Sequence, residues 1–266
     1  MHPVLFEAGP LTVYTYGLLL AAAYLLGLQF AIVRARTRGL DPNKVMDLGI
    51  WIIISALIGA KLLLVIVESG RLMARPQDLL DILRAGGVFY GGLVAAVIVA
   101  LFYLRRHRLP VWQTTDVFAP SIALGHVVGR FGCLFAGCCF GRPTDLPWAI
   151  TFHNELAAAN GTPLGVPLHP TQLYDAGAEL LILAFLLTVE RLGRPFPGRT
   201  FWSYMLLYAV SRFVIEFYRG DPRGMVGVLS TSQFVSIVLA PLALLMLFIL
   251  GHRPGPEPVL ARPRAA

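Results

Sequence analysis

The chain has 266 residues, of which 56% are hydrophobic and only 14% are charged. A soluble domain usually carries about 25% charged residues, so this composition excludes an ordinary soluble protein and indicates a polytopic membrane protein. The net charge of +7 is explained by basic loops held against anionic lipid, and no nucleic-acid partner is expected.

Seven apolar stretches predict transmembrane helices, each of which needs about 20 residues. These spans are residues 12–33, 46–67, 87–104, 115–134, 171–190, 200–218 and 230–250. The first ten residues lack Lys and Arg, so no cleavable signal peptide is expected. We predict an all-α fold with one integral membrane domain over residues 1–250, followed by a disordered, proline- and arginine-rich cytoplasmic tail over 251–266.

The distribution of Lys and Arg predicts the orientation of the helices. Thirteen of these residues follow spans one, three, five and seven, and six lie in the segments on the opposite side. Because basic loops stay in the cytoplasm, the N-terminus is expected outside and the C-terminus inside. The long segment 135–170 then forms a small outward-facing head between spans four and five.

Two tyrosines lie near the predicted outer ends of spans one and three. Tyr16 stands in TYGLLL, and Tyr90 stands in GGVFYGGL at 86–93. An isolated tyrosine at this depth is usually part of the interfacial aromatic belt. The glycines around Tyr90 open space for a ligand beside its hydroxyl.

Span four carries an unusual number of polar groups for a membrane helix. It contains Asp116, Pro120, His126 and Arg130, so it should face protein or water and not lipid. An arginine stays charged, and its burial costs several kcal/mol unless an anion or a water-filled cavity receives it. His126 shares a helical face with Arg130, where it can relay a proton or bind a neighbouring helix.

The end of span four reads GRFGCLFAGCCFG at 129–141. Its glycines permit an anion-binding nest of amides beside Arg130, or simply close helix packing. Cys133, Cys138 and Cys139 are too few for a disulfide framework. A single disulfide, thiol redox chemistry and metal binding with His153 or His169 are alternatives without a recognisable spacing, and we predict neither metal nor cofactor.

Span five begins at HPTQLYD, residues 169–175. Pro170 suits a helix start, and Thr171 or His169 can cap the free amides. A helix N-terminus favours an anion, which makes Gln172 and Tyr174 candidate ligand contacts. The alternative is a helix cap followed by an aromatic belt residue.

Span six contains YAVSRFVIEFYRGDP at 208–222. Tyr208, Arg212, Glu216 and Arg219 recur at helical spacing, which indicates the wall of a polar cavity. A self-contained pair of Arg212 with Glu216 is the alternative, and both can hold if Glu216 orients Arg212 towards an anion. Arg219, at the membrane edge, is expected to contact lipid headgroups or the membrane interface.

Together and in this order, the five motifs resemble the prolipoprotein diacylglyceryl transferase family. The resemblance implies an enzyme of the bacterial cytoplasmic (inner) membrane with its active site toward the outer leaflet. It would transfer the diacylglyceryl group of phosphatidylglycerol, a membrane lipid, to the lipobox cysteine in a prolipoprotein signal peptide. A thioether would form and glycerol phosphate would leave.

The resemblance also implies roles for individual residues. Arg130 and Arg212 would stabilise the departing phosphate, with Glu216 and Tyr208 beside Arg212. The predicted catalytic residues are Arg130, Arg212, Tyr90, Glu216 and Tyr208. The predicted substrate-binding residues are Tyr16, Gly141, His169, Gln172, Tyr174, Arg219 and His126.

This chain departs from the family pattern at three positions. Tyr90 replaces a histidine, and Cys133 and Cys138 replace asparagine and glutamate. Because tyrosine is a poor base at neutral pH, the base is left open between Tyr90, His169, His126 and none. Alternative functions are a family paralogue with another acceptor, a phospholipid or small-anion transporter, and an inactive scaffold. A transporter would favour inverted repeats, which the chain does not display.

Overall fold

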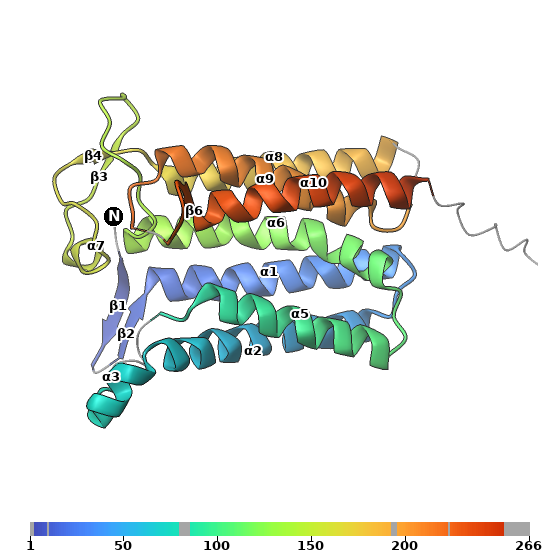
Figure 1. Ribbon diagram of the computed structural model, residues 1–266, viewed down its shortest axis with the longest axis horizontal. Coiled ribbons are helices and arrows are strands. Elements are labelled where there is room, and N and C mark those ends of the chain that lie inside the picture. The colour runs from blue at the N-terminus through green and yellow to red at the C-terminus, as the bar shows by residue number, and fades with distance from the viewer. Residues whose placement is uncertain (1–2, 10, 80–85, 193–195, 223, 253–266) are drawn as a thin grey trace, which may run out of the picture.

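The structure is a computed structural model that describes residues 3–9, 11–79, 86–192, 196–222 and 224–252. Within these residues, long helices run side by side as an elongated bundle (Figure 1). They are α1 (Thr15–Thr37), α2 (Pro42–Val67), α5 (Phe89–Arg106), α6 (Val111–Ala136), α8 (Thr171–Leu192), α9 (Arg199–Ile215) and α10 (Thr231–Gly251).

Six of these helices, all except α9, are long and apolar enough to cross a membrane. The described chain therefore has the architecture of a mostly helical polytopic membrane protein, as predicted. Helix α9 has 17 residues, fewer than the about 20 that a span usually needs. The predicted disordered tail lies beyond residue 252, outside the described residues.

The N-terminal hairpin was not predicted from the sequence. Strands β1 (Val4–Ala8) and β2 (Leu11–Tyr14) form an antiparallel hairpin, and α1 begins only at Thr15. The apolar character of β2 was interpreted as membrane helix, although Thr12 and Val13 are β-branched and favour a strand. Shorter elements complete the fold: α3 (Ser69–Ala74), η1 (Pro76–Asp78), β3 (Ile150–Thr151), α7 (Glu155–Ala159), β4 (Pro167–Leu168), η2 (Glu216–Tyr218), β5 (Met225–Val226) and β6 (Leu229–Ser230).

Helix α6 lies in the centre of the bundle, in contact with α1, α8 and α9. Its polar residue Asp116 is buried, with its side chain accepting hydrogen bonds from two backbone amides at the start of α9. This agrees with the expectation that the fourth span faces protein. Glycines allow α1 and α6 to approach closely, since a Cβ at Gly27 or Gly125 would lie 3.1 Å from a backbone oxygen of the other helix.

The two ends of the bundle differ in character. At one end, where α1 finishes and α8 finishes, Glu190 pairs with Arg34 at 2.6 Å and with Arg38 at 3.0 Å. At the other end, residues 137–170 fold into a cap that contains β3, β4 and α7 (Figure 1). A small apolar cluster of Phe140, Phe152, Ala157 and Leu168 holds this head together.

Candidate active site

The site begins where α6 ends. Gly137 has a φ of +67°, which permits the reversal of the chain. Its amide donates to Leu134 O, and the amide of Cys138 donates to Cys133 O, both at 3.1 Å. This pair of bonds is a Schellman motif, and it brings Cys138 back beside Cys133.

The first residues of α8 fix the loop that follows this motif. Thr171 Oγ1 donates to Cys139 O at 2.8 Å, and Gln172 Nε2 donates to Cys138 O at 2.7 Å. Both side chains are almost fully buried. The hydroxyl of Thr171 therefore fixes the backbone at Cys139. Gln172 lies in the site mainly to support the backbone at Cys138.

Gly141 stands where three segments meet. A Cβ there would overlap the backbone oxygen of His169 and lie 2.9 Å from Tyr218 O. The next residue, Arg142, receives a hydrogen bond on its carbonyl from His169 N and donates its own amide to Tyr218 O. Glycine at 141 thus allows the head, the start of α8 and the end of η2 to pack against one another.

Arg130 is the centre of a buried polar network between α6 and α8. Its Nε donates to His126 Nε2 at 3.0 Å, and its Nη1 lies 3.1 Å from Asp175 Oδ2. The other ring nitrogen of His126, Nδ1, lies 2.7 Å from Glu179 Oε1. Among the described residues, Nη2 of Arg130 has no hydrogen-bond or ion-pair partner.

Arg219 was predicted to contact lipid headgroups, but it is only 5% exposed. It forms a bidentate pair with Asp221 at 2.8 and 2.9 Å, and its Nη1 lies 3.5 Å from Asp175. The prediction assumed a continuous helix, whereas α9 ends at Ile215 and η2 then turns the chain inward beside Gly141. Burial opposes the charged form, yet the Asp221 carboxylate raises the pKa of Arg219 above its ordinary value.

Arg212 lies at the end of α9 and is 6% exposed. Its Nη2 is 2.6 Å from Glu216 Oε2 and donates to Ser232 Oγ at 3.0 Å. The predicted pair of Arg212 with Glu216 is therefore present. Tyr208, one turn earlier, lies within electrostatic reach of both Arg212 and Arg130, and its ring is 5.8 Å from that of His126.

The charges of this arginine cluster are nearly balanced. Three guanidiniums, of Arg130, Arg212 and Arg219, face four carboxylates, of Asp175, Glu179, Glu216 and Asp221. Several of these ion pairs are short, but their geometry does not make a hydrogen bond. Asp175 Oδ2, both carboxylate oxygens of Glu179 and Arg219 Nη1 are buried, with no hydrogen-bond partner among the described residues. Buried polar atoms of this kind are uncommon in a purely structural core.

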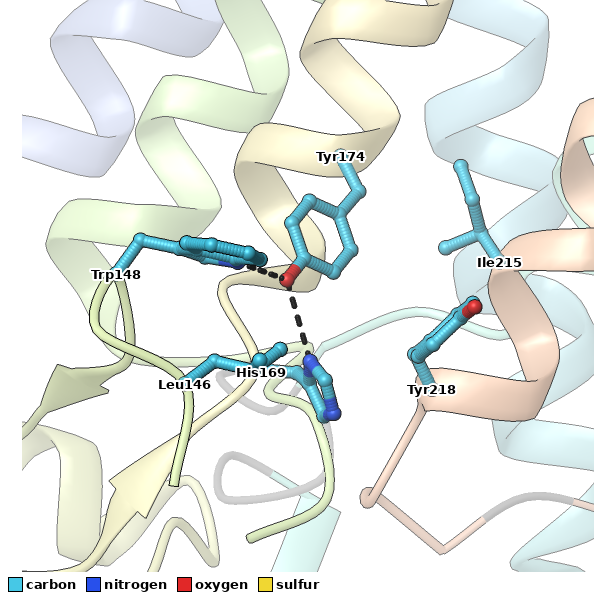
Figure 2. Close-up of a pocket in the computed structure, with 6 residues that line it drawn as sticks. All are labelled: Leu146, Trp148, His169, Tyr174, Ile215 and Tyr218. Atoms are coloured by element: carbon cyan, nitrogen blue, oxygen red, sulfur yellow. Dashed lines mark hydrogen bonds between the residues drawn. The ribbon is translucent and has the colours of Figure 1, made fainter. Parts of the chain in front are cut away.

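A cavity of about 460 Å³ adjoins the cluster. It is lined by Leu146, Trp148, His169, Tyr174, Ile215 and Tyr218. Figure 2 shows the Tyr174 hydroxyl between two of these side chains, where it accepts a hydrogen bond from Trp148 Nε1 at 2.8 Å and lies 3.1 Å from His169 Nδ1. Ile215 and Tyr218 face the cavity from the opposite side; Ile215 immediately precedes the η2 turn, and Tyr218 is its last residue.

The two remaining predicted residues lie elsewhere. Tyr16 packs against Gly132 of α6, within electrostatic reach of the three cysteines. Tyr90 is 41% exposed, and its ring contacts Phe89. Among the described residues, no hydrogen bond, ion pair or ring contact joins Tyr90 to the arginine cluster.

Four polar members of the site were not identified from the sequence: Asp175, Glu179, Asp221 and Ser232. A signal for two of them was present. Asp175 and Glu179 stand four residues apart inside an apolar span, and ionisable residues in that setting are functional candidates. Asp221 and Ser232 both lie beyond α9, and Ser232 is brought to Arg212 only in the folded chain.

Comparison with known proteins identifies relatives along nearly the whole chain. The family model described as "Prolipoprotein diacylglyceryl transferase" matches residues 3–249. A protein of Clostridium tetani named phosphatidylglycerol--prolipoprotein diacylglyceryl transferase is 38% identical over 237 residues, which are 89% of this chain and 93% of that protein. Proteins with the same name from Synechococcus elongatus and Trichormus variabilis are 37% and 34% identical, covering 89% and 98% of this chain and 83% and 94% of theirs.

Proposed function

The chain belongs to the prolipoprotein diacylglyceryl transferase family, and from this premise we propose that it moves the diacylglyceryl group of phosphatidylglycerol onto a prolipoprotein. The acceptor is the thiol of the lipobox cysteine in the signal peptide. The sulfur attacks the glycerol carbon, the bond from that carbon to the phosphate oxygen breaks, and glycerol phosphate leaves. The product is a thioether.

The observation that carries this proposal is that Arg130 and Arg212, whose side chains are largely buried, both lie within electrostatic reach of Tyr208. A phosphate monoester gains negative charge as it departs, and fixed cations in a dry site stabilise that charge strongly. Nη2 of Arg130 has no partner among the described residues, so it can donate to a phosphate oxygen without breaking a contact. Glu216 holds Arg212 in place at 2.6 Å.

Carboxylates beside both arginines do not exclude the phosphate. Two donors of the cluster, Arg130 Nη2 and Arg219 Nη1, have no hydrogen-bond partner among the described residues. In this proposal the carboxylates orient the guanidiniums, and the phosphate takes the donors that remain. Removing a single donor from such a site typically costs about 10²–10³-fold in kcat.

Of the histidines, His169 suits proton removal from the acceptor thiol better than His126. Both ring nitrogens of His126 are in contact with charged side chains, Arg130 and Glu179, which makes His126 a positioning residue. His169 lines the cavity, and its Nε2 has no hydrogen-bond partner among the described residues. Tyr90, which is 41% exposed, would donate its hydroxyl to the lipid.

The proposed topology has seven spans, with α9 as the short sixth, an outward N-terminus and a cytoplasmic C-terminus. It is supported by the arginines at the bundle end far from the head: Arg34, Arg36, Arg38, Arg105 and Arg106. The site and the head then face the outer leaflet of the bacterial cytoplasmic membrane, where the signal peptide emerges.

The decisive experiment is mass spectrometry of a lipobox peptide incubated with the purified protein and phosphatidylglycerol vesicles. We expect the cysteine to gain one diacylglyceryl unit, and a peptide with serine in place of this cysteine to gain none. Arg212→Ala should insert into the membrane but leave the peptide unmodified. Lipid flux across the vesicles without a covalent product would instead indicate a transporter, and normal labelling by Arg212→Ala would contradict the proposed role of this residue.

A further inference from the structure

Cys133, Cys138 and Cys139 form a cluster that the arginine chemistry does not use. All three are free thiols and half-buried, and their sulfur atoms lie within 4.8 Å of one another. Cysteines can pack as small apolar residues, but this cluster lies among ionic groups. Apolar packing alone therefore does not account for three converging sulfur atoms in a polar site.

The backbone around the cluster is held in place from several directions. The Schellman motif at Gly137 sets Cys138 beside Cys133, and α8 fixes the carbonyls of Cys138 and Cys139. Cys139 has a φ of +61°, a conformation that a residue other than glycine seldom adopts. Such strained conformations persist where surrounding contacts enforce them, and they concentrate at functional sites.

Two guanidinium groups lie near the sulfur cluster. Arg219 lies within electrostatic reach of the sulfur of Cys139. Arg130 lies within electrostatic reach of Cys133 and Cys139. A cation site is indicated by the geometry, since the three sulfur atoms converge within 4.8 Å of one another.

We propose that Cys133, Cys138 and Cys139 bind one Zn²⁺ ion, which leaves its fourth position open for the thiol of the acceptor peptide. With zinc–sulfur bonds of about 2.3 Å, tetrahedral thiolates lie about 3.8 Å apart, so the cluster closes around the ion with side-chain shifts below about 1 Å. Three protein ligands and one open position are the arrangement of a catalytic zinc site, not of a structural one. The spacing of the cysteines along the chain does not match a known zinc motif, because the site depends on the chain reversal at Gly137.

The catalytic half of this inference rests on the proposed transferase function. The acceptor thiol loses its proton when it coordinates zinc, since a coordinated thiol is deprotonated, and His169 accepts that proton as proposed above. The resulting thiolate attacks the glycerol carbon, and the electron pair of the broken carbon–oxygen bond leaves with the phosphate. The neutral thioether is a weaker ligand than the thiolate and departs. Metal activation would supply the nucleophile in a chain that has Tyr90 where the family has a histidine.

Metal binding can be tested without any measurement of transfer. The reduced, chelator-treated full-length protein in detergent is titrated with Zn²⁺ and, for spectroscopy, with Co²⁺. We expect one metal ion per chain and a sulfur-to-cobalt charge-transfer band. Serine at any one of the three cysteines should weaken binding by more than roughly tenfold, because even partners outside the first coordination shell contribute that much. His153→Ala, which removes another possible zinc ligand of the head, serves as the matched control and should bind normally.

The acceptor position is tested with the cobalt-loaded protein. A lipobox peptide with cysteine should shift the charge-transfer band, and the same peptide with serine should not. The inference is overturned if metal binding is not saturable, if the triple serine variant binds equally well, or if the native protein carries a disulfide between two of these cysteines. Undiminished transfer by metal-free protein would overturn the catalytic role. Cysteine-dependent zinc binding without any transfer would support the metal site and count against the proposed function.

Discussion

Replacing Asp175 by asparagine removes the carboxylate that two buried guanidiniums share. Its Oδ2 lies 3.1 Å from Arg130 and 3.5 Å from Arg219. At an effective dielectric constant of about 20, each contact is worth about 5 kcal/mol of Coulomb energy, most of which desolvation offsets. Breaking a buried pair by removing one partner typically costs about 3–5 kcal/mol. We expect Asp175→Asn to lower the free energy of unfolding by about this amount or slightly less, because the amide oxygen is still an acceptor.

Activity should fall as well, since Arg130 loses the partner that fixes its Nη1. If Arg130 can no longer donate to the phosphate in the correct position, kcat should fall by about 10²–10³-fold. The assay is the initial rate of lipobox peptide modification, measured with thermal unfolding of the same preparation in detergent. Rates are compared well below the unfolding midpoint, so that the folded fraction is the same for each protein.

Glu190→Gln is the matched control. Glu190 is 2.6 Å from Arg34, and its side chain is as buried as that of Asp175, but it lies at the opposite end of the bundle. This variant should lose similar stability and keep kcat within about threefold, because distant sites act independently. If Asp175→Asn and Glu190→Gln lost the same activity, the loss in Asp175→Asn would be an effect of reduced stability. A folded Asp175→Asn protein with normal kcat would refute the claim that Asp175 orients the arginines.

Three further predictions concern individual side chains. Arg212→Lys keeps the charge but loses the planar fork, so kcat should fall by about 10²-fold with a smaller change in KM for phosphatidylglycerol; a pure KM effect in steady-state kinetics would contradict this. Gly141→Ala should lower the stability of the protein by about 1–3 kcal/mol in thermal unfolding, because the added Cβ would overlap the backbone oxygen of His169. Gly177→Ala is the control. It should be neutral or slightly stabilising, because the space around Gly177 is open. Tyr90→Phe should lower kcat/KM about tenfold or more, the value of one hydrogen bond to a charged group; unchanged kinetics would remove Tyr90 from the site.

The helical bundle was predictable because apolar stretches of span length have few other solutions in a membrane protein. Each predicted span corresponds to one long helix, with ends that differ by a few residues. The β1–β2 hairpin was missed because Thr12, Val13 and Tyr14 are compatible with both a strand and the start of a span. Hydropathy cannot separate the two at a boundary, where the turn at Gly9 decides the outcome.

The site was predictable as far as local spacing determines it. His126 with Arg130, and Arg212 with Glu216, are four residues apart, and both pairs form. Contacts between helices depend on how each helix is rotated about its axis, which spacing alone does not give. The pairing of Arg130 with Asp175 is therefore a result of the fold.

The internal counter-charges of the arginine cluster have a consequence for turnover. A chamber of bare cations would hold its first phosphate tightly and would be costly to maintain in the bilayer between reactions. Here Asp175, Glu216 and Asp221 already accompany the guanidiniums. In the proposed mechanism, these carboxylates compete with the leaving glycerol phosphate for the guanidiniums once the carbon–oxygen bond is broken. Such competition shortens product residence and returns the enzyme to a neutral resting state.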